Sequence, residues 1–104
     1  MNGFSSGFTT GFTIGHDHPA LQGHFPGHPV VPGVVILDHV IEAANAHHPR
    51  GRVVTISHAK FHRPLPLDRY CDIDWSMRPG DRLGFRCLSG ETLICSGELQ
   101  RETP

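Results

Sequence analysis

One segment of this sequence has the pattern of a helix, and that segment is apolar on nearly every side. It covers residues 34–46, in which positions 34–37 and 40–41 are all aliphatic. Pro32 and Gly33 mark its start, because a proline at the first turn of a helix loses no hydrogen bond. A helix that is apolar almost all round has to be covered on most sides. The rest of the chain must therefore supply a surface that wraps it.

Most of the remaining sequence has the pattern of strands. Segments with alternating apolar residues or β-branched residues are separated by turn sequences, at 8–14, 53–56, 60–65, 69–77, 83–87 and 92–100. Such alternation is typical of antiparallel strands with one buried face. We predict an α+β fold in which an antiparallel sheet of five or six strands wraps around one long central helix. The chain of 104 residues is expected to form a single domain over 1–104, with the Gly- and Ser-rich residues 1–7 disordered.

Composition excludes several classes of protein. The net charge of -1 and the pI of about 6.7 give no case for nucleic-acid binding. The N-terminal residues lack the pattern of a secretory signal, and no stretch approaches the roughly 18 apolar residues of a membrane span. The three cysteines form no Cys-x-x-Cys pair, and their odd number fits a reducing compartment. We expect a cytoplasmic protein whose cysteines lie in strands or in the core.

The loop before the helix and one acid within it form the candidate active site. Several prolines stiffen the loop, which carries His24 and His28. Asp38 lies inside the apolar part of the helix, where an ionised carboxylate needs a cavity, a group to cap or a basic partner. A histidine and a carboxylate beside an apolar pocket can act as general base and acid. The amide at Gly33, at the start of the helix, can polarise a carbonyl.

These residues also resemble a known family. The run HFPGHPVVPGV at 24–34 is similar to the signature of the hot-dog-fold 3-hydroxyacyl-[acyl-carrier-protein] dehydratases of fatty-acid synthesis. AKFHRP at 59–64 resembles the strand that follows the helix in that family, and the likeness covers residues 12–100 in order. The run that begins at Asp17 also resembles the short dehydratase-like proteins of aryl-polyene and related lipid gene clusters.

The resemblance implies an enzyme, a dehydratase that converts a 3-hydroxyacyl thioester into the trans-2-enoyl thioester. His24 would remove the C2 proton, Asp38 would protonate the departing hydroxyl directly or through water, and the Gly33 N–H would hold the thioester oxygen. No metal and no redox cofactor are required. The acyl tunnel is expected to be lined by Phe25, Val31 and Leu37. Acyl carrier protein, with its phosphopantetheine arm, is the implied partner.

The same resemblance implies a homodimer or a larger homo-oligomer, in which the histidine and the acid of one site come from different subunits. Position 38 carries Asp where the family branch without isomerase activity usually has Glu. The Asp alone does not establish isomerisation. Basic residues are interpreted either as a solvated face or as a docking patch for the acidic carrier protein: His47, His48, Arg50, Arg52, Lys60, His62 and Arg63.

Three other functions stay open at this point. A hot-dog acyl-thioester hydrolase shares the fold but usually lacks the His-Phe-Pro-Gly loop. A catalytically weak partner subunit of another dehydratase would not need both candidate residues. A zinc or nickel site is the third alternative, since imidazoles bind these metals, although the spacing is not that of a structural zinc site; its ligands would come from His16, His18, His24 and His28.

Overall fold

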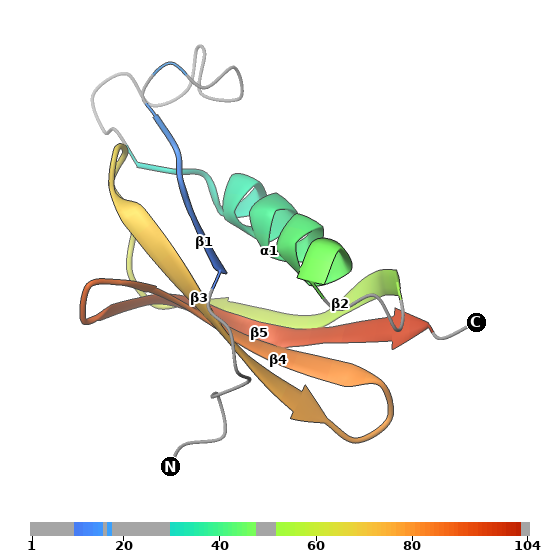
Figure 1. The fold of residues 1–104 in the computed structure, drawn as a ribbon. Helices are drawn as coiled ribbons and strands as arrows, with labels where there is room; N and C mark the ends of the chain where they lie inside the picture. Colours follow the sequence, from blue (N-terminus) through green and yellow to red (C-terminus); the bar gives the residue numbers. More distant parts are fainter. Residues whose placement is uncertain (1–9, 16, 18–29, 48–51, 103–104) are drawn as a thin grey trace.

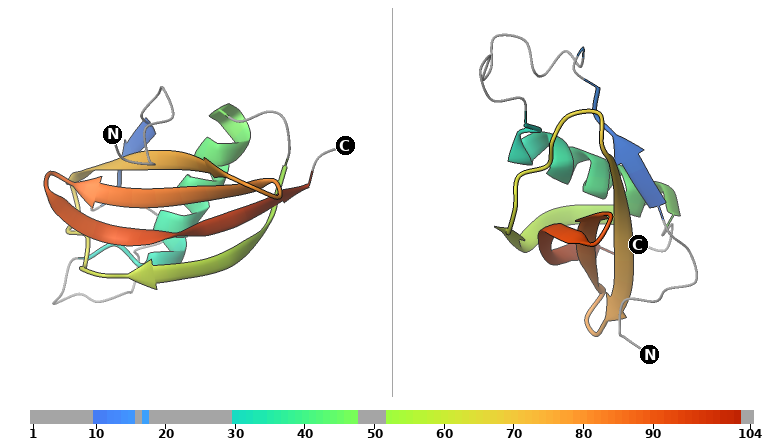
Figure 2. Two further views of the ribbon diagram at one scale, coloured as in Figure 1. Left: turned by 90° about the horizontal axis from the view of Figure 1, so that it is seen from below. Right: turned by 90° about the vertical axis from the view of Figure 1, so that its left-hand side faces the viewer.

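The structure, a computed structural model, describes residues 10–15, 17, 30–47 and 52–102. Within these residues the elements are β1 (Thr10–Thr13), α1 (Gly33–His47), β2 (Arg52–Phe61), β3 (Tyr70–Arg78), β4 (Arg82–Ser89) and β5 (Thr92–Glu102). The strands form one antiparallel sheet in the order β1-β3-β4-β5-β2. α1 lies across one face of this curved sheet (Figures 1 and 2). The predicted α+β architecture is confirmed.

The core lies between α1 and the sheet. Val35, Ile36, Val40 and Ala44 recur along α1 at helical spacing and are buried. They meet the inner face of the sheet, whose fully buried side chains include Trp75, Phe85, Leu83 and Leu99. Each large aliphatic or aromatic side chain buried in this way stabilises the fold by about 1.5–3 kcal/mol.

The edge of the sheet beside the candidate site differs from the prediction. Two strands were expected at 53–56 and 60–65, whereas β2 runs without a break to Phe61. Two register shifts against β5 interrupt its alternation, which is why the sequence pattern divides it. The strand ends because the next two residues both donate their N–H to the Ile94 carbonyl, at 2.8 and 3.3 Å. Pro64, which follows, has no N–H to continue a ladder.

The helix is less enclosed than its composition predicts. It begins at Gly33, one residue earlier than expected. Val34 is 66% exposed, and Asp38, one turn further along, is exposed too. The expectation of cover on most sides is wrong for the chain on its own, because one curved sheet covers only one side of α1. In the part of the chain that the structure describes, no helix is long and apolar enough to span a bilayer.

The predicted positions of the cysteines are confirmed. Cys71, Cys87 and Cys95 lie on β3, β4 and β5, are fully buried and are unpaired. Hydrogen bonds with the Cys71 and Cys95 thiols, together with burial, raise the pKa of Cys87. β4 and β5 form a hairpin: Ser89 pairs with Thr92 around a turn in which Gly90 has a φ of 62°.

Candidate active site

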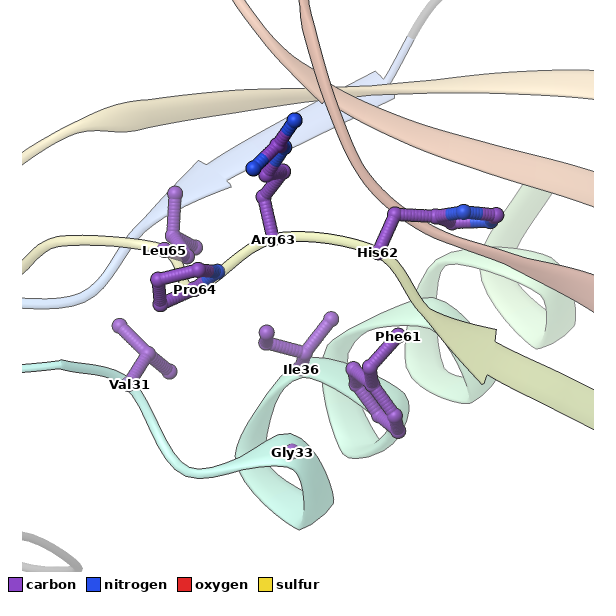
Figure 3. Close-up of a pocket in the computed structure, with 8 residues that line it drawn as sticks. All are labelled: Val31, Gly33, Ile36, Phe61, His62, Arg63, Pro64 and Leu65. Atoms are coloured by element: carbon purple, nitrogen blue, oxygen red, sulfur yellow. The ribbon is translucent and has the colours of Figure 1, made fainter.

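A cavity of about 360 Å³ opens at the N-terminal end of α1 (Figure 3). Two segments far apart in sequence form it, the chain that enters α1 and the chain that leaves β2. The Val31 N–H donates to the Leu65 carbonyl at 2.8 Å, and Val30 forms an isolated bridge with Pro66. These contacts hold the two walls together. The described residues that line the cavity are Val31, Gly33, Ile36, Phe61, His62, Arg63, Pro64 and Leu65.

The start of the helix faces this cavity. The Pro32 carbonyl accepts hydrogen bonds from the amides of Val35 and Ile36, at 3.0 and 3.3 Å. Pro32 is therefore the N-cap and Gly33 the first helical residue. The first amides of a helix have no carbonyl of their own helix to bond, and they carry the positive end of its dipole. At Gly33 this positive end borders an apolar space.

An aromatic ring lies directly against Gly33. A Cβ placed on Gly33 would lie 2.8 Å from the Cζ of Phe61 and 3.2 Å from both Cε atoms. The tip of the ring therefore occupies the space that any other side chain at position 33 would need. Figure 3 shows the ring beside the first turn of α1. Phe61 keeps 47% of its surface exposed, so the ring also borders the open side of the cavity.

The walls of the cavity differ in polarity. Val31, Ile36 and Leu65 are buried and form an apolar base. His62 and Arg63 form a rim, and the Arg63 side chain extends away from α1 (Figure 3). His62 pairs with Ser96 through Nε2 and Oγ at 2.9 Å, and Arg63 is exposed. The cavity can accept an apolar group at its base and an anionic group at its edge.

The structure brings together only some of the predicted site residues. Gly33 and Val31 line the cavity, whereas Leu37 does not and packs, partly buried, against the core. Asp38 lies on the outward side of α1, one turn after the exposed Val34, and it is not among the described residues that line this cavity. Its position follows from helical spacing, because the residues that face the sheet are at 35, 36, 40 and 44. The remaining predicted residues lie outside the described part: His24, Phe25 and His28.

Some lining residues were not expected from the sequence. Phe61 is the main example, although the segment AKFHRP that contains it had been singled out for its resemblance. The available signal was an aromatic residue three positions before Pro64, where the strand pattern ends. The four histidines proposed as metal ligands, at 16, 18, 24 and 28, lie outside the described residues. Among the residues that are described, no three His, Cys, Asp or Glu side chains are grouped to hold a metal ion.

Comparison with known proteins identifies the family. The model of the ApeI-like family, described as ApeI dehydratase, matches residues 5–98. The chain belongs to this family. It is also 33% identical over 85 residues to the 3-hydroxyacyl-[acyl-carrier-protein] dehydratase FabZ of Aliarcobacter butzleri, a match that covers 69% of this chain and 50% of that protein. The FabZ of Thermus thermophilus is 40% identical over 92 residues, and this match covers 80% of this chain and 49% of that FabZ. The chain thus spans about half the length of these curated relatives.

Solved structures agree on the fold, which is the hot-dog fold. A dehydratase heterocomplex, ApeI:P from Xenorhabdus doucetiae, superposes with a TM-score of 0.77 at 22% identity, covering 89% of this chain and 84% of the other. A probable thioesterase from Bartonella henselae superposes with a TM-score of 0.61 at 15% identity, and the match covers 93% of this chain and 96% of the thioesterase. Because both identities are low, these two structures support the fold alone.

Proposed function

We propose that this protein removes water from a 3-hydroxyacyl thioester, carried on acyl carrier protein, to give the trans-2-enoyl thioester. The observation that carries the proposal is the start of α1, where Gly33 borders an apolar cavity in a member of the ApeI-like dehydratase family. Loss of the C2 proton leaves negative charge on the thioester oxygen. An amide at the positive end of a helix dipole stabilises charge at that position.

The acid and base complete the reaction. His24 would take the proton from C2, and Asp38 would give a proton to the leaving 3-hydroxyl, directly or through a water molecule. The C3–O bond then breaks, the C2–C3 double bond forms, and water departs. The acyl chain would follow the apolar base of the cavity, beside Val31 and Ile36. Phe25 and Leu37 remain proposed tunnel residues.

A second copy of the chain is part of this proposal. Asp38 lies on the side of α1 that its own sheet leaves uncovered. β2 is the last strand of the sheet and pairs only with β5 among the described strands. We propose that a copy packed against this side covers Asp38, and the family resemblance implies that this copy supplies the histidine of the site. A site shared in this way requires a homodimer or a larger homo-oligomer.

The rim of the cavity supports a carrier-protein substrate. Lys60, His62 and Arg63 are exposed at the end of β2, beside the cavity. Acidic carrier proteins and the phosphate of their pantetheine arm are attracted to such a cationic rim. The three buried, unpaired thiols support a reducing, cytoplasmic setting for the reaction.

The test is incubation of the purified protein with a 3-hydroxyacyl thioester on carrier protein. We expect the absorbance of the enoyl thioester to rise, without release of free thiol. Release of thiol would instead identify a hydrolase. Turnover only after addition of a second, different hot-dog subunit would identify a partner subunit. That alternative is kept because ApeI:P of Xenorhabdus doucetiae is a heterocomplex and because Asp38 is uncovered within this chain.

A further inference from the structure

The Phe61 ring is partly exposed at the mouth of the cavity. It is one of four large apolar side chains that stay exposed among the described residues, with 47% of its surface accessible. Apolar surface that stays exposed does not contribute the stabilisation of about 25 cal/mol per Å² that its burial would give. The ring nevertheless lies against Gly33 at the mouth of the cavity, where a smaller residue at 61 would leave a wider opening. This placement indicates that the ring shapes what can enter.

The ring constrains one part of a thioester in particular. A carbonyl oxygen that accepts a hydrogen bond from the Gly33 N–H lies about 2.9 Å from the Gly33 nitrogen. C1 and C2 of the acyl group follow within two bonds, so we expect them near the first turn of α1, where the Phe61 ring lies. The Phe61 Cζ lies 2.8 Å from the Cβ position of Gly33. A methyl group needs about 3.5–4.0 Å from ring carbons, so a branch at C2 directed towards the ring would compete with the ring for space.

Building on the proposed function, we propose that Phe61 is a specificity-determining residue, whose ring admits thioesters with an unbranched C2 and excludes those with a methyl branch there. The substrate class is therefore 3-hydroxyacyl thioesters with a CH2 at C2. A single methyl or methylene group in an apolar pocket discriminates by about 10–200-fold. The Phe61 ring is expected to provide discrimination of this size.

The test compares two substrates, a straight-chain 3-hydroxyacyl thioester and its 2-methyl counterpart, which retains one proton at C2. In the unmodified protein, kcat/KM is expected to favour the straight chain by at least about tenfold. Phe61→Ala should reduce this ratio about tenfold, mainly through faster turnover of the branched substrate. An unchanged ratio, or an equal loss on both substrates, would overturn the proposal.

A matched control is available at the other edge of the sheet. Tyr70 is 56% exposed, and its ring lies against Gly11 as Phe61 lies against Gly33. Tyr70→Ala removes an exposed aromatic ring of similar size away from the cavity, so the substrate ratio should not change. If both variants change the ratio equally, the effect is not specific to Phe61. Gel filtration completes the control: a Phe61→Ala protein that only dissociates, with its ratio unchanged, would assign Phe61 to an interface instead.

Binding separates this inference from the proposed function. Saturated acyl-pantetheine amides, straight and 2-methyl, cannot react and can be titrated by calorimetry. The unmodified protein should bind the straight analogue at least about tenfold more tightly, and Phe61→Ala should narrow that ratio. Absence of turnover with this binding pattern would contradict the dehydratase activity but keep the role of Phe61. Equal binding of both analogues, or binding of neither, would contradict the role of Phe61 whatever the turnover.

Discussion

The two sides of α1 differ in burial within this chain. The side that faces the sheet carries Val35, Ile36, Val40 and Ala44, all buried in the core. The outward side carries Val34, which is 66% exposed, and Asp38, which is also exposed. The sequence of the first two turns is almost uniformly apolar, so the difference comes from the architecture, not from the residues. One sheet covers one side of a helix and leaves the other side uncovered within this chain.

The inner side of α1 contributes to stability, and the outer side carries the proposed acid. The inner side of α1 is buried against the chain's own sheet. The outer side holds the proposed acid, and its apolar neighbour at position 34 is uncovered. We infer that the fold is complete in one chain and that the proposed site is not. The predictions below test the two sides separately.

The largest effect is expected on the outer side. Asp38→Asn should lower turnover by at least about 10²-fold, because the amide cannot protonate the leaving hydroxyl. His24→Ala should lower turnover by a similar factor. The thermal midpoint of Asp38→Asn should stay close to that of the unmodified protein, since the side chain is exposed. Steady-state kinetics and thermal unfolding provide the two measurements, and near-normal turnover would remove the residue from the mechanism.

A matched pair of valines compares the two sides directly. Val40 is fully buried, so Val40→Ala should lower the free energy of unfolding by about 1–3 kcal/mol. Val34→Ala should change it by less than about 0.5 kcal/mol in dilute solution, because the side chain is exposed. Urea unfolding gives both values. If the loss of stability in Val34→Ala grows with protein concentration, a second copy covers Val34. If Val34→Ala and Val40→Ala lose the same free energy of unfolding in dilute solution, the proposed difference between the two sides of α1 is wrong.

The choice of histidine is tested by a milder substitution. His28→Gln should lower turnover by less than about tenfold, because the proposed base is the histidine before Phe-Pro. The measurement is kcat beside that of His24→Ala in the same assay. A loss as large as that of His24→Ala would show that the assignment of the base is wrong.

The smallest effect is expected away from both sides of α1, on the outer face of the sheet. Glu98 accepts a hydrogen bond from the Arg78 Nη1 at 3.0 Å and lies 3.7 Å from the Arg82 Nη1. These guanidinium groups, first the hydrogen bond from Arg78, lower the pKa of Glu98. The pKa of Glu98 is lower in the folded state than in the unfolded state. Its ionised side chain therefore stabilises the fold at pH values above the unfolded-state pKa. That contribution disappears as the pH falls through the folded pKa.

Glu98→Gln should therefore be less stable than the unmodified protein at pH 7, and this difference should vanish at acidic pH. Urea unfolding at several pH values measures it. Turnover should not change, because Glu98 lies across the sheet from α1. A difference in stability that stays constant with pH would show that the ion pair is not its cause.

The sequence predicts the fold class well because alternation and helical spacing are local signals. The strand after the helix was divided in two because its bulges displace the alternation, and bulges depend on pairing with β5. The exposure of Asp38 could not be predicted, since an apolar helix does not reveal whether its own chain or another covers it. Phe61 was missed because its contact with Gly33 joins residues 28 positions apart, a relation that no local pattern records.

The most direct test of the shared site mixes two inactive variants. Chains carrying His24→Ala and chains carrying Asp38→Asn are co-expressed with different tags, and enoyl-thioester formation is measured on the purified mixed oligomer. If His24 of one chain works with Asp38 of another, each purified mixed dimer holds one intact site out of two, and it should show about half of the unmodified turnover. A mixture as inactive as either variant alone would contradict the account.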